Sequence, residues 1–255
     1  NHIYRQSQES GIIQLAHSIR NDQYDENLFF QYHDIHFQSC VPYDVVKNVK
    51  ILVSKAIQEG YDANDIQVLA PMYNGVAGID ALNDCLQELL NPQDGFKNEL
   101  RVGKRIFREG DKILQLKNRI DDNVFNGDIG ILEEICYKDN FEFLTDTLIV
   151  NFDGEYVEYT SNEFYTITHA YCMSIHKSQG NEFKIVIMPI LKDYYIMLRK
   201  NLIYTGLTRA KQSLFILGNH QAFGYGITNN HDEKRRTTLK QKLLSNDDIS
   251  VYDFE

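Results

Sequence analysis

Tryptophan is absent from this sequence, and cysteine and proline are scarce, with four residues of each among 255. The cysteines are far apart and form no Cys-x-x-Cys pair; they are Cys40, Cys85, Cys136 and Cys172. This spacing favours reduced thiols over a disulfide framework or a zinc site, so no metal is expected. Long apolar runs are also missing, because the stretch 185–191 is too short to span a bilayer and contains a proline. We see no signal peptide and expect a cytoplasmic protein without membrane contacts.

Positive charge is in deficit, since 26 lysines and arginines face 36 aspartates and glutamates and the net charge is −10. That balance argues against a protein that coats DNA through general positive charge, but it still permits a narrow cationic track. No Gly-x-x-x-x-Gly-Lys-Ser/Thr phosphate loop occurs in the sequence. The hydrophobic content of 43% is sufficient for a normal packed core.

The first part of the chain, residues 1–97, alternates between helical and strand patterns. Apolar spacing predicts helices over 12–19, after Ser7 as N-cap, and over 45–56 and 79–89, and short apolar runs predict strands at 28–32 and 66–70. This alternation indicates an α/β layer structure with a mainly parallel sheet.

The pattern changes over residues 98–165, which are rich in short β segments. Strands are predicted at 113–116, 130–135, 141–144, 148–152 and 155–159. Asp153-Gly154 is a hairpin signal, and Asn126-Gly127-Asp128 marks another turn. We therefore predict a small antiparallel barrel inserted within the α/β domain. Basic residues at its start suggest DNA on that side; they are Lys97, Arg101, Lys104, Arg105 and Arg108.

The α/β pattern resumes over 166–225. Strands are predicted at 168–173, 184–188 and 214–217, a short helix from Ser174 to Gly180, and a long helix from Tyr195 to about Arg209. The remaining tail, 226–255, is polar and is expected to pack weakly.

Arg209 stands at the end of the predicted long helix and has two interpretations. A cation there simply complements the helix dipole. Alternatively it is an arginine finger, which stabilises charge on a transferred phosphate. The surrounding Tyr204-Thr205-Gly206-Leu207-Thr208-Arg209-Ala210-Lys211 favours the second interpretation.

Two further segments combine polar residues with strand ends. His176-Lys177-Ser178-Gln179-Gly180, after a strand, can aim backbone amides and basic donors at an anion. The loop Pro71-Met72-Tyr73-Asn74-Gly75 follows the strand 66–70, at the carboxyl end where ligands of α/β folds gather. The loop alone is equally well explained as a structural connection. A lone histidine at 176 would also be structural, but the whole motif, followed by Glu182 and Phe183 before a strand, is much rarer by chance.

Taken in order, these motifs resemble the RecD-type helicases of superfamily 1, the family of the exodeoxyribonuclease V α-subunit. The resemblance rests on Tyr-Arg-Gln-Ser at 4–7, Ala-Pro-Met-Tyr at 70–73, Val-Phe-Asn-Gly-Asp at 124–128, and the 176–180 and 204–210 motifs. It implies a RecA-like second motor domain with an inserted barrel like a Src-homology-3 domain.

The resemblance also implies site residues. Arg209 and Arg5 are expected as catalytic γ-phosphate ligands. Nucleotide-binding residues are expected at Tyr4, Gln6, Gly180 and Glu182. Single-stranded DNA is expected at Pro71, Tyr73, Asn74, Ser174, His176 and Lys177. Ser174 replaces the threonine usual in this motif but keeps the hydroxyl.

The expected whole is an ATP- and Mg²⁺-dependent DNA helicase of recombination and repair that travels 5′ to 3′, with possible nuclease-complex subunits as partners. Because the chain starts at Asn1 and lacks the phosphate loop, we expect a fragment without the first RecA-like domain, inactive alone and with no tightly bound cofactor. Two alternatives remain: a non-catalytic nucleic-acid- or protein-binding module on a motor-domain fold, and a Pif1-like or relaxase-type helicase fragment.

Overall fold

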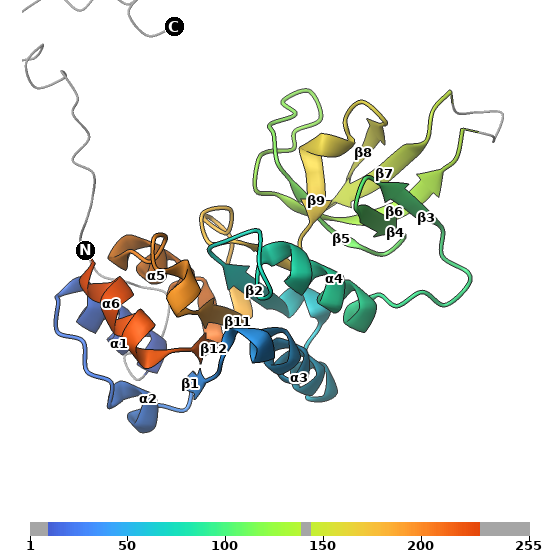
Figure 1. Ribbon diagram of the computed structural model, residues 1–255. Coiled ribbons are helices and arrows are strands. Elements are labelled where there is room, and N and C mark those ends of the chain that lie inside the picture. The colour runs from blue at the N-terminus through green and yellow to red at the C-terminus, as the bar shows by residue number, and fades with distance from the viewer. Residues whose placement is uncertain (1–9, 139–143, 230–255) are drawn as a thin grey trace, which may run out of the picture.

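A parallel five-stranded sheet forms the centre of the larger part of the molecule in the computed structural model, which describes residues 10–138 and 144–229 (Figure 1). The strand order is β1-β12-β11-β2-β10. The strands are β1 (Ile35–Ser39), β2 (Ile66–Ala70), β10 (Cys172–Ser174), β11 (Phe183–Ile190) and β12 (Ala210–Gly218). β2 is buried at all of its positions and β11 at all but Lys184. Such unbroken burial is typical of parallel strands covered on both faces.

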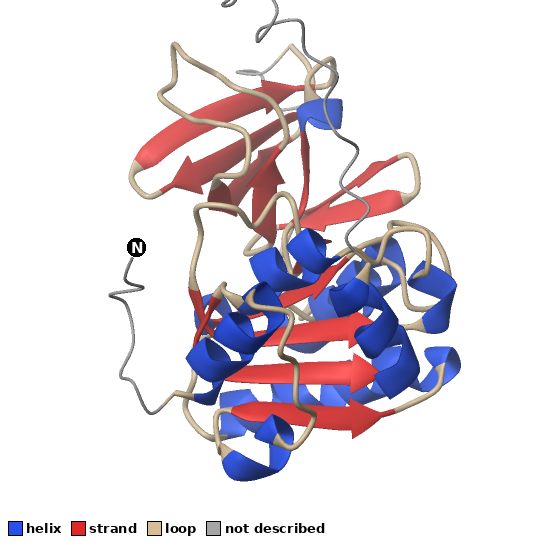
Figure 2. Ribbon diagram, turned by 90° about the vertical axis from the view of Figure 1, so that its left-hand side faces the viewer, coloured by secondary structure: helices blue, strands red, loops and turns tan. Residues whose placement is uncertain are grey.

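Helices cover both faces of this sheet (Figure 2). α3 (Val45–Gln58) packs against α4 (Ile79–Leu90), and on the other side α5 (Lys200–Leu207) contacts α1 (Gly11–Arg20) and α6 (His220–Thr228). Right-handed crossovers from β1 to β2 and from β11 to β12 run in opposite directions along the sheet, so they place α3 and α5 on opposite faces.

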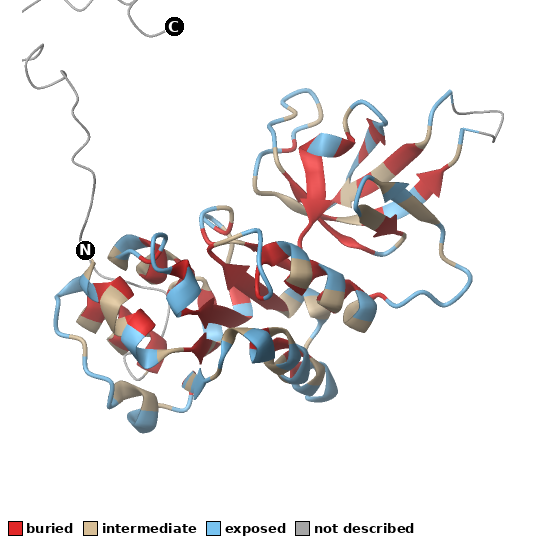
Figure 3. Ribbon diagram, viewed as in Figure 1, coloured by how far each residue is buried: buried red, intermediate tan, exposed pale blue. Residues whose placement is uncertain are grey.

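The second part is an antiparallel barrel with its own core (Figure 3). Its five-stranded sheet has the order β8-β7-β6-β5-β9, and a separate hairpin joins β3 to β4. The strands are β3 (Glu99–Val102), β4 (Arg105–Arg108), β5 (Lys112–Gln115), β6 (Ile129–Cys136), β7 (Thr147–Phe152), β8 (Glu155–Thr160) and β9 (Ile167–His169). The predictions of a mainly parallel α/β sheet and of an inserted antiparallel barrel are confirmed.

The predicted strand 168–173 is wrong as a single element. β9 pairs with β5 of the barrel, whereas β10 pairs with β2 of the parallel sheet. Ala170 and Tyr171 form the passage between them and are buried. Because every residue from Ile167 to Met173 is buried in one core or the other, the apolar pattern carries no sign of the switch.

Residues 28–32 are also predicted wrongly. They contain the short helix α2 (Leu28–Gln31), and the edge strand of the sheet is β1. Phe29 packs edge-to-face on Phe37 and Phe223, so its apolar character serves packing of a helix rather than a strand. β1 escapes prediction because only Ile35 among its five residues is fully buried.

Three helix predictions need correction. Residues 175–180 form turns rather than a helix, and the long helix from Tyr195 is shortened to α5 after a 3₁₀ turn at Lys192–Tyr194. The N-cap of α1 is Ser10, not Ser7. An unpredicted helix, α6, begins at His220 and includes the first residues of the expected tail 226–255. Parts of two predictions, the strand at 141–144 and the tail beyond 229, lie outside the described residues. No helix in the described ranges has the length and apolar character needed to cross a membrane.

Candidate functional site

Two of the predicted segments leave the sheet side by side. Ala70 ends β2 and Ser174 ends β10, and these two residues are register partners in the parallel pairing. The loop 71–78 and the segment 175–182 therefore begin at the same carboxyl edge, where polar groups of α/β folds gather.

The loop 71–78 is closed by backbone hydrogen bonds. The carbonyls of Met72 and Tyr73 accept from the amides of Ile79 and Asp80, 2.9 and 3.2 Å away, in the first turn of α4. Gly78 closes the loop so tightly that a Cβ there would lie 2.3 Å from the Tyr73 carbonyl oxygen. The closure leaves Tyr73 and Asn74 exposed.

Pro71 lies at the start of this loop and is buried. It shapes the loop, therefore, and offers little surface to a nucleic acid. Tyr73 keeps 43% of its surface exposed, which makes it the aromatic residue of the loop that a base could reach.

The segment 175–182 runs back across the sheet. It starts beside Ala70, and it enters β11, whose Ile185 pairs with Ile66 at the other end of β2. At about 3.3 Å per residue the return spans about 13 Å. His176 is exposed and Lys177 half-buried near the carboxyl edge, whereas Glu182 lies at the amino edge. The residues expected at DNA and at the nucleotide therefore occupy opposite ends of one segment.

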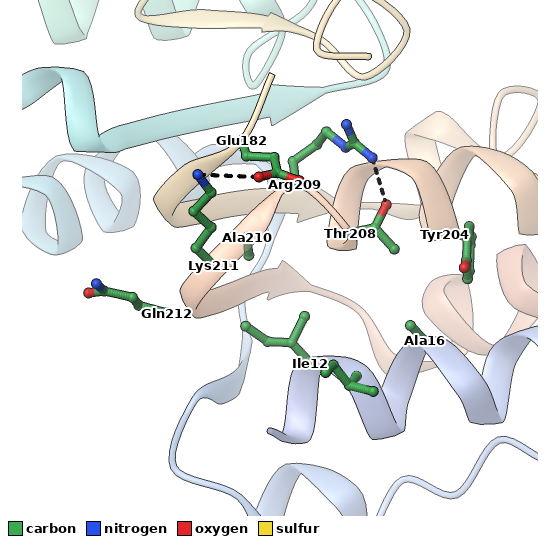
Figure 4. Close-up of a pocket in the computed structure, with 10 residues that line it drawn as sticks. Ile12, Ala16, Glu182, Tyr204, Thr208, Arg209, Ala210, Lys211 and Gln212 are labelled. Atoms are coloured by element: carbon green, nitrogen blue, oxygen red, sulfur yellow. Dashed lines mark hydrogen bonds and ion pairs between the residues drawn. The ribbon is translucent and has the colours of Figure 1, made fainter. Parts of the chain in front are cut away.

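A pocket of about 420 Å³ opens at the amino edge of β11 and β12 (Figure 4). One wall is apolar and comes from α1, with Ile12, Ile13 and Ala16. The other wall comes from the end of α5 and the starts of β11 and β12, and its residues are Glu182, Tyr204, Thr208, Arg209, Ala210, Lys211 and Gln212.

Arg209 is half-buried in this pocket and is held by neutral oxygens. Its Nε donates to the Thr205 carbonyl at 3.1 Å, Nη1 to the Asn181 carbonyl at 3.1 Å, and Nη2 to Thr208 Oγ1 at 3.2 Å. These bonds use three of the five N–H donors of a guanidinium. Among the described residues Arg209 forms no ion pair, so its charge is not neutralised by a carboxylate.

Glu182 and Lys211 form an ion pair at 3.2 Å across the pocket rim. The Lys211 side chain remains 53% exposed, so the pair contributes at most about 1 kcal/mol. Lys211 was not among the predicted site residues, although it directly follows the Thr-Arg-Ala motif. Its position two residues after Arg209, at the second residue of β12, was the available signal.

The structure therefore brings Arg209 and Glu182 together in one pocket. Gly180 does not line the pocket. This glycine has φ +95° and makes a left-handed turn just before Asn181. Tyr4, Arg5 and Gln6 lie outside the described residues. Whether Arg5 joins Arg209 thus stays a prediction. Within the described ranges no cluster of three metal-binding side chains occurs.

The basic edge expected to face DNA on the barrel is partly engaged elsewhere. Arg108 is buried and pairs with Glu88 at 2.9 Å and with Glu99 at 2.6 Å, so it serves the junction with α4. Lys104 and Arg105 line a separate cleft of about 310 Å³ together with Asp80 and Asp84 of α4.

Comparison with known families finds two matches in this chain. Residues 82–152 match the family described as the ATP-dependent RecD-like DNA helicase SH3 domain. Residues 169–217 match the UvrD-like helicase C-terminal domain. The first match covers most of the barrel strands. The second covers the segment 175–182 and the strands β11 and β12, whose starts line the pocket.

Whole-sequence comparison gives relatives of the same kind. The ATP-dependent RecD2 DNA helicase of Deinococcus radiodurans is 31% identical over 245 residues, covering 94% of this chain and 31% of that protein. The RecBCD enzyme subunit RecD of Buchnera aphidicola (subspecies Schizaphis graminum) is 23% identical over 240 residues, covering 86% of this chain and 38% of that protein. The chain thus spans about a third of the length of these curated relatives.

Solved structures with a similar fold include Pif1 helicase from Candida albicans, with a TM-score of 0.53 at 16% identity over 95% of this chain and 60% of that one. Bacteroides Pif1 bound to single-stranded DNA gives a TM-score of 0.51 at 15% identity, over 84% and 50%. At these identities the likeness shows the fold alone, and it confirms the predicted RecA-like fold.

Proposed function

This chain is homologous to the RecD and RecD2 helicases and comprises a helicase C-terminal region, and from this premise we propose that it is the second motor domain of an ATP-dependent DNA helicase. In this proposal the phosphate loop and the Mg²⁺ ligands belong to a first RecA-like domain, since no phosphate loop occurs in these 255 residues. The observation that carries the proposal is the half-buried Arg209, which lines a pocket with its charge unpaired by any described carboxylate.

The pocket suits a nucleotide chemically. Ile12, Ile13 and Ala16 offer an apolar wall, whereas Arg209 offers a positive charge. Lys211 is paired with Glu182 at the rim. Arg209 retains guanidinium donors that can be directed at phosphate oxygens, for which its planar geometry is well suited. A bound nucleoside triphosphate would supply the phosphoryl group whose charge these donors can stabilise. Tyr4, Arg5, Gln6, Gly180 and Glu182 complete the proposed nucleotide-binding set.

The carboxyl edge is the proposed site for single-stranded DNA. Tyr73 offers an exposed ring for base stacking, and the half-buried Lys177 a cation for the backbone. Asn74, Ser174 and His176 add polar donors at the same edge. The crossover 175–182 runs from this edge to the pocket, and this continuity gives a direct route by which nucleotide and DNA can influence each other. Travel from 5′ to 3′ and a role in recombination and repair belong to the proposal as well.

The test is an ATPase and DNA-binding comparison in the enzyme that combines this chain with its phosphate-loop domain. Arg209→Ala should lower DNA-stimulated turnover about 10³-fold while single-stranded DNA affinity stays within twofold. The exposed Arg199, at the start of the same helix, is the matched control, and Arg199→Ala should be neutral. Equal loss of turnover and DNA binding in Arg209→Ala would assign Arg209 a folding role instead. This chain alone should show no DNA-stimulated hydrolysis, and turnover at the level of a complete helicase would overturn the proposal.

A further inference from the structure

Asn181 contacts both the pocket and the barrel. Its backbone carbonyl accepts from Arg209 Nη1 at 3.1 Å, and its side-chain Nδ2 donates to the carbonyl of Gly127 at 3.1 Å. Gly127 belongs to the turn Asn126-Gly127-Asp128 that joins the barrel strands β5 and β6. One residue between the two sheets therefore touches the guanidinium and the inserted domain at once.

The backbone at Gly180 allows this double contact. With φ +95°, Gly180 turns the chain left-handed just before Asn181, a conformation that residues with a side chain rarely adopt. After this turn the Asn181 amide nitrogen donates to the Ser178 carbonyl at 3.1 Å, which fixes the peptide. The carbonyl is thereby presented to Arg209, and the side chain to Gly127.

The barrel turn is itself rigidly held. The Gly127 amide donates to the Gln115 carbonyl at 2.9 Å, and Gln115 is fully buried and accepts from the Tyr159 hydroxyl at 2.6 Å. The Asn126 amide donates to Asn118 Oδ1 at 2.9 Å. Gly127 is thus connected through Gln115 to Tyr159 in the barrel core.

A second contact joins the same two segments. The Lys177 ammonium donates to Asn126 Oδ1. A Cβ at Gly127 would lie 3.4 Å from the Lys177 carbonyl oxygen, so the turn and the crossover are in close contact here. The turn therefore spans the crossover from Lys177, at the DNA edge, to Asn181, beside the pocket.

We propose that Asn181 is a positioning residue through which the inserted barrel fixes the orientation of Arg209. The barrel turn binds the Asn181 side chain, and the Asn181 carbonyl binds the guanidinium. A displacement of the guanidinium therefore also displaces the barrel turn. The catalytic consequence rests on the proposed function, whereas the mechanical link between Arg209 and the turn does not.

The link is tested first in this chain by hydrogen–deuterium exchange of the turn 125–128. Asn181→Ala removes the donor to Gly127, and Arg209→Ala removes the partner of the Asn181 carbonyl. Each should speed exchange at the turn about three- to tenfold, as expected for the loss of one hydrogen bond. Asn64→Ala and Arg199→Ala, at exposed positions away from the turn, are the controls and should leave exchange unchanged. Unaltered exchange of the turn in Arg209→Ala would overturn the link.

The catalytic consequence is tested in the enzyme that includes the phosphate-loop domain. Asn181→Ala should lower kcat for ATP about three- to tenfold with an unchanged KM, and Asn181→Gln, which restores a donor, should recover part of the loss. A merely structural role would not separate kcat from KM in this way, and an unchanged kcat would contradict the positioning role. Absence of any ATP hydrolysis in the unmodified enzyme would count against the proposed function, while the exchange experiment would still decide the link.

Discussion

The carboxylate of Asp111 and the phenol of Tyr171 meet at 2.9 Å where the barrel joins the parallel sheet. Asp111 is completely buried, and it also accepts from Gln87 of α4 at 2.6 Å and from Asn91, the residue that ends this helix, at 2.8 Å. His169 Nε2 lies 3.1 Å from the same carboxylate. One acidic side chain of the barrel thereby binds both α4 and Tyr171, which lies where the chain returns from the barrel to the parallel sheet.

This carboxylate gives the first prediction, which concerns acid stability. Burial raises the pKa of Asp111, but hydrogen bonds from His169, Asn91 and the Arg108 amide outweigh it, and the net pKa lies below the ordinary 3.8. A lowered folded pKa contributes stability that is present above the unfolded value and is lost as the pH falls through the folded one. Stability of the chain should therefore drop steeply below pH 3.8.

Asp111→Asn should remove that acid-dependent contribution and cost roughly 2–3 kcal/mol at pH 7. Urea unfolding followed by circular dichroism between pH 3 and 7 measures both quantities. An unchanged stability at pH 7 would show that the junction does not depend on this charge.

Lys112 gives a prediction at alkaline pH. Burial lowers the pKa of this fully enclosed lysine to about 8, and its ammonium contacts Gln67 Oε1 at 3.2 Å. Between pH 8 and the ordinary 10.5 the unfolded chain therefore binds more protons than the folded chain. The free energy of unfolding should rise with pH in that window, by roughly 3 kcal/mol over its whole width. Lys112→Met should abolish the slope. Urea unfolding at pH 7.5, 8.5 and 9.5 compares the two proteins, and parallel curves would contradict the assignment.

Gly78 gives a prediction about DNA binding. A Cβ at this position would meet the backbone of Tyr73 and Asn74 at 2.3 and 2.6 Å, so Gly78→Ala must displace the loop that presents both residues. Affinity for a fluorescent oligodeoxythymidine should fall about tenfold, as measured by anisotropy, since loss of one stacked base costs about 1–3 kcal/mol. Gly224→Ala is the matched control, because nothing lies within 4 Å of its added Cβ. Normal affinity in Gly78→Ala would remove this loop from the DNA site.

Asp34 gives a prediction about the apolar wall of the pocket. Its carboxylate accepts from Ser10 Oγ at 2.7 Å and from the Gly11 and Ile12 amides at 2.9 and 3.3 Å, so it caps α1 from a distance in sequence. Asp34→Ala should cost about 1–2 kcal/mol of unfolding free energy. Asp121→Ala, at an exposed aspartate, should cost less than about 0.5 kcal/mol. Equal costs in chemical denaturation would refute the capping role.

Much of the fold could be predicted from local pattern. Helical spacing predicted helices over 45–56 and 79–89, which are α3 and α4, and the apolar run predicted the strand 66–70, because each of these elements buries one face or both in a single core. The passage at Ala170 and Tyr171 could not be predicted, since one continuous apolar run serves two cores.

The candidate site was predictable to the same extent. The motif around Arg209 and Glu182 identified two residues that share the pocket. The double role of Asn181 has no local signature, because its partners, Gly127 and Arg209, are 54 and 28 residues away. The roles of Asp34 and Asp111 could not be predicted for the same reason. Their partners are distant in the sequence, so neither role produces a local pattern.

The chain's exit into the barrel and its return lie almost at one point. Asn91 Nδ2 and the Tyr171 hydroxyl both bind the same oxygen of Asp111, at 2.8 and 2.9 Å. With its two connections side by side, the barrel is inserted without separating the strands of the parallel sheet. β2 and β10, which lie before and after the insertion in the chain, are still neighbours and pair in register.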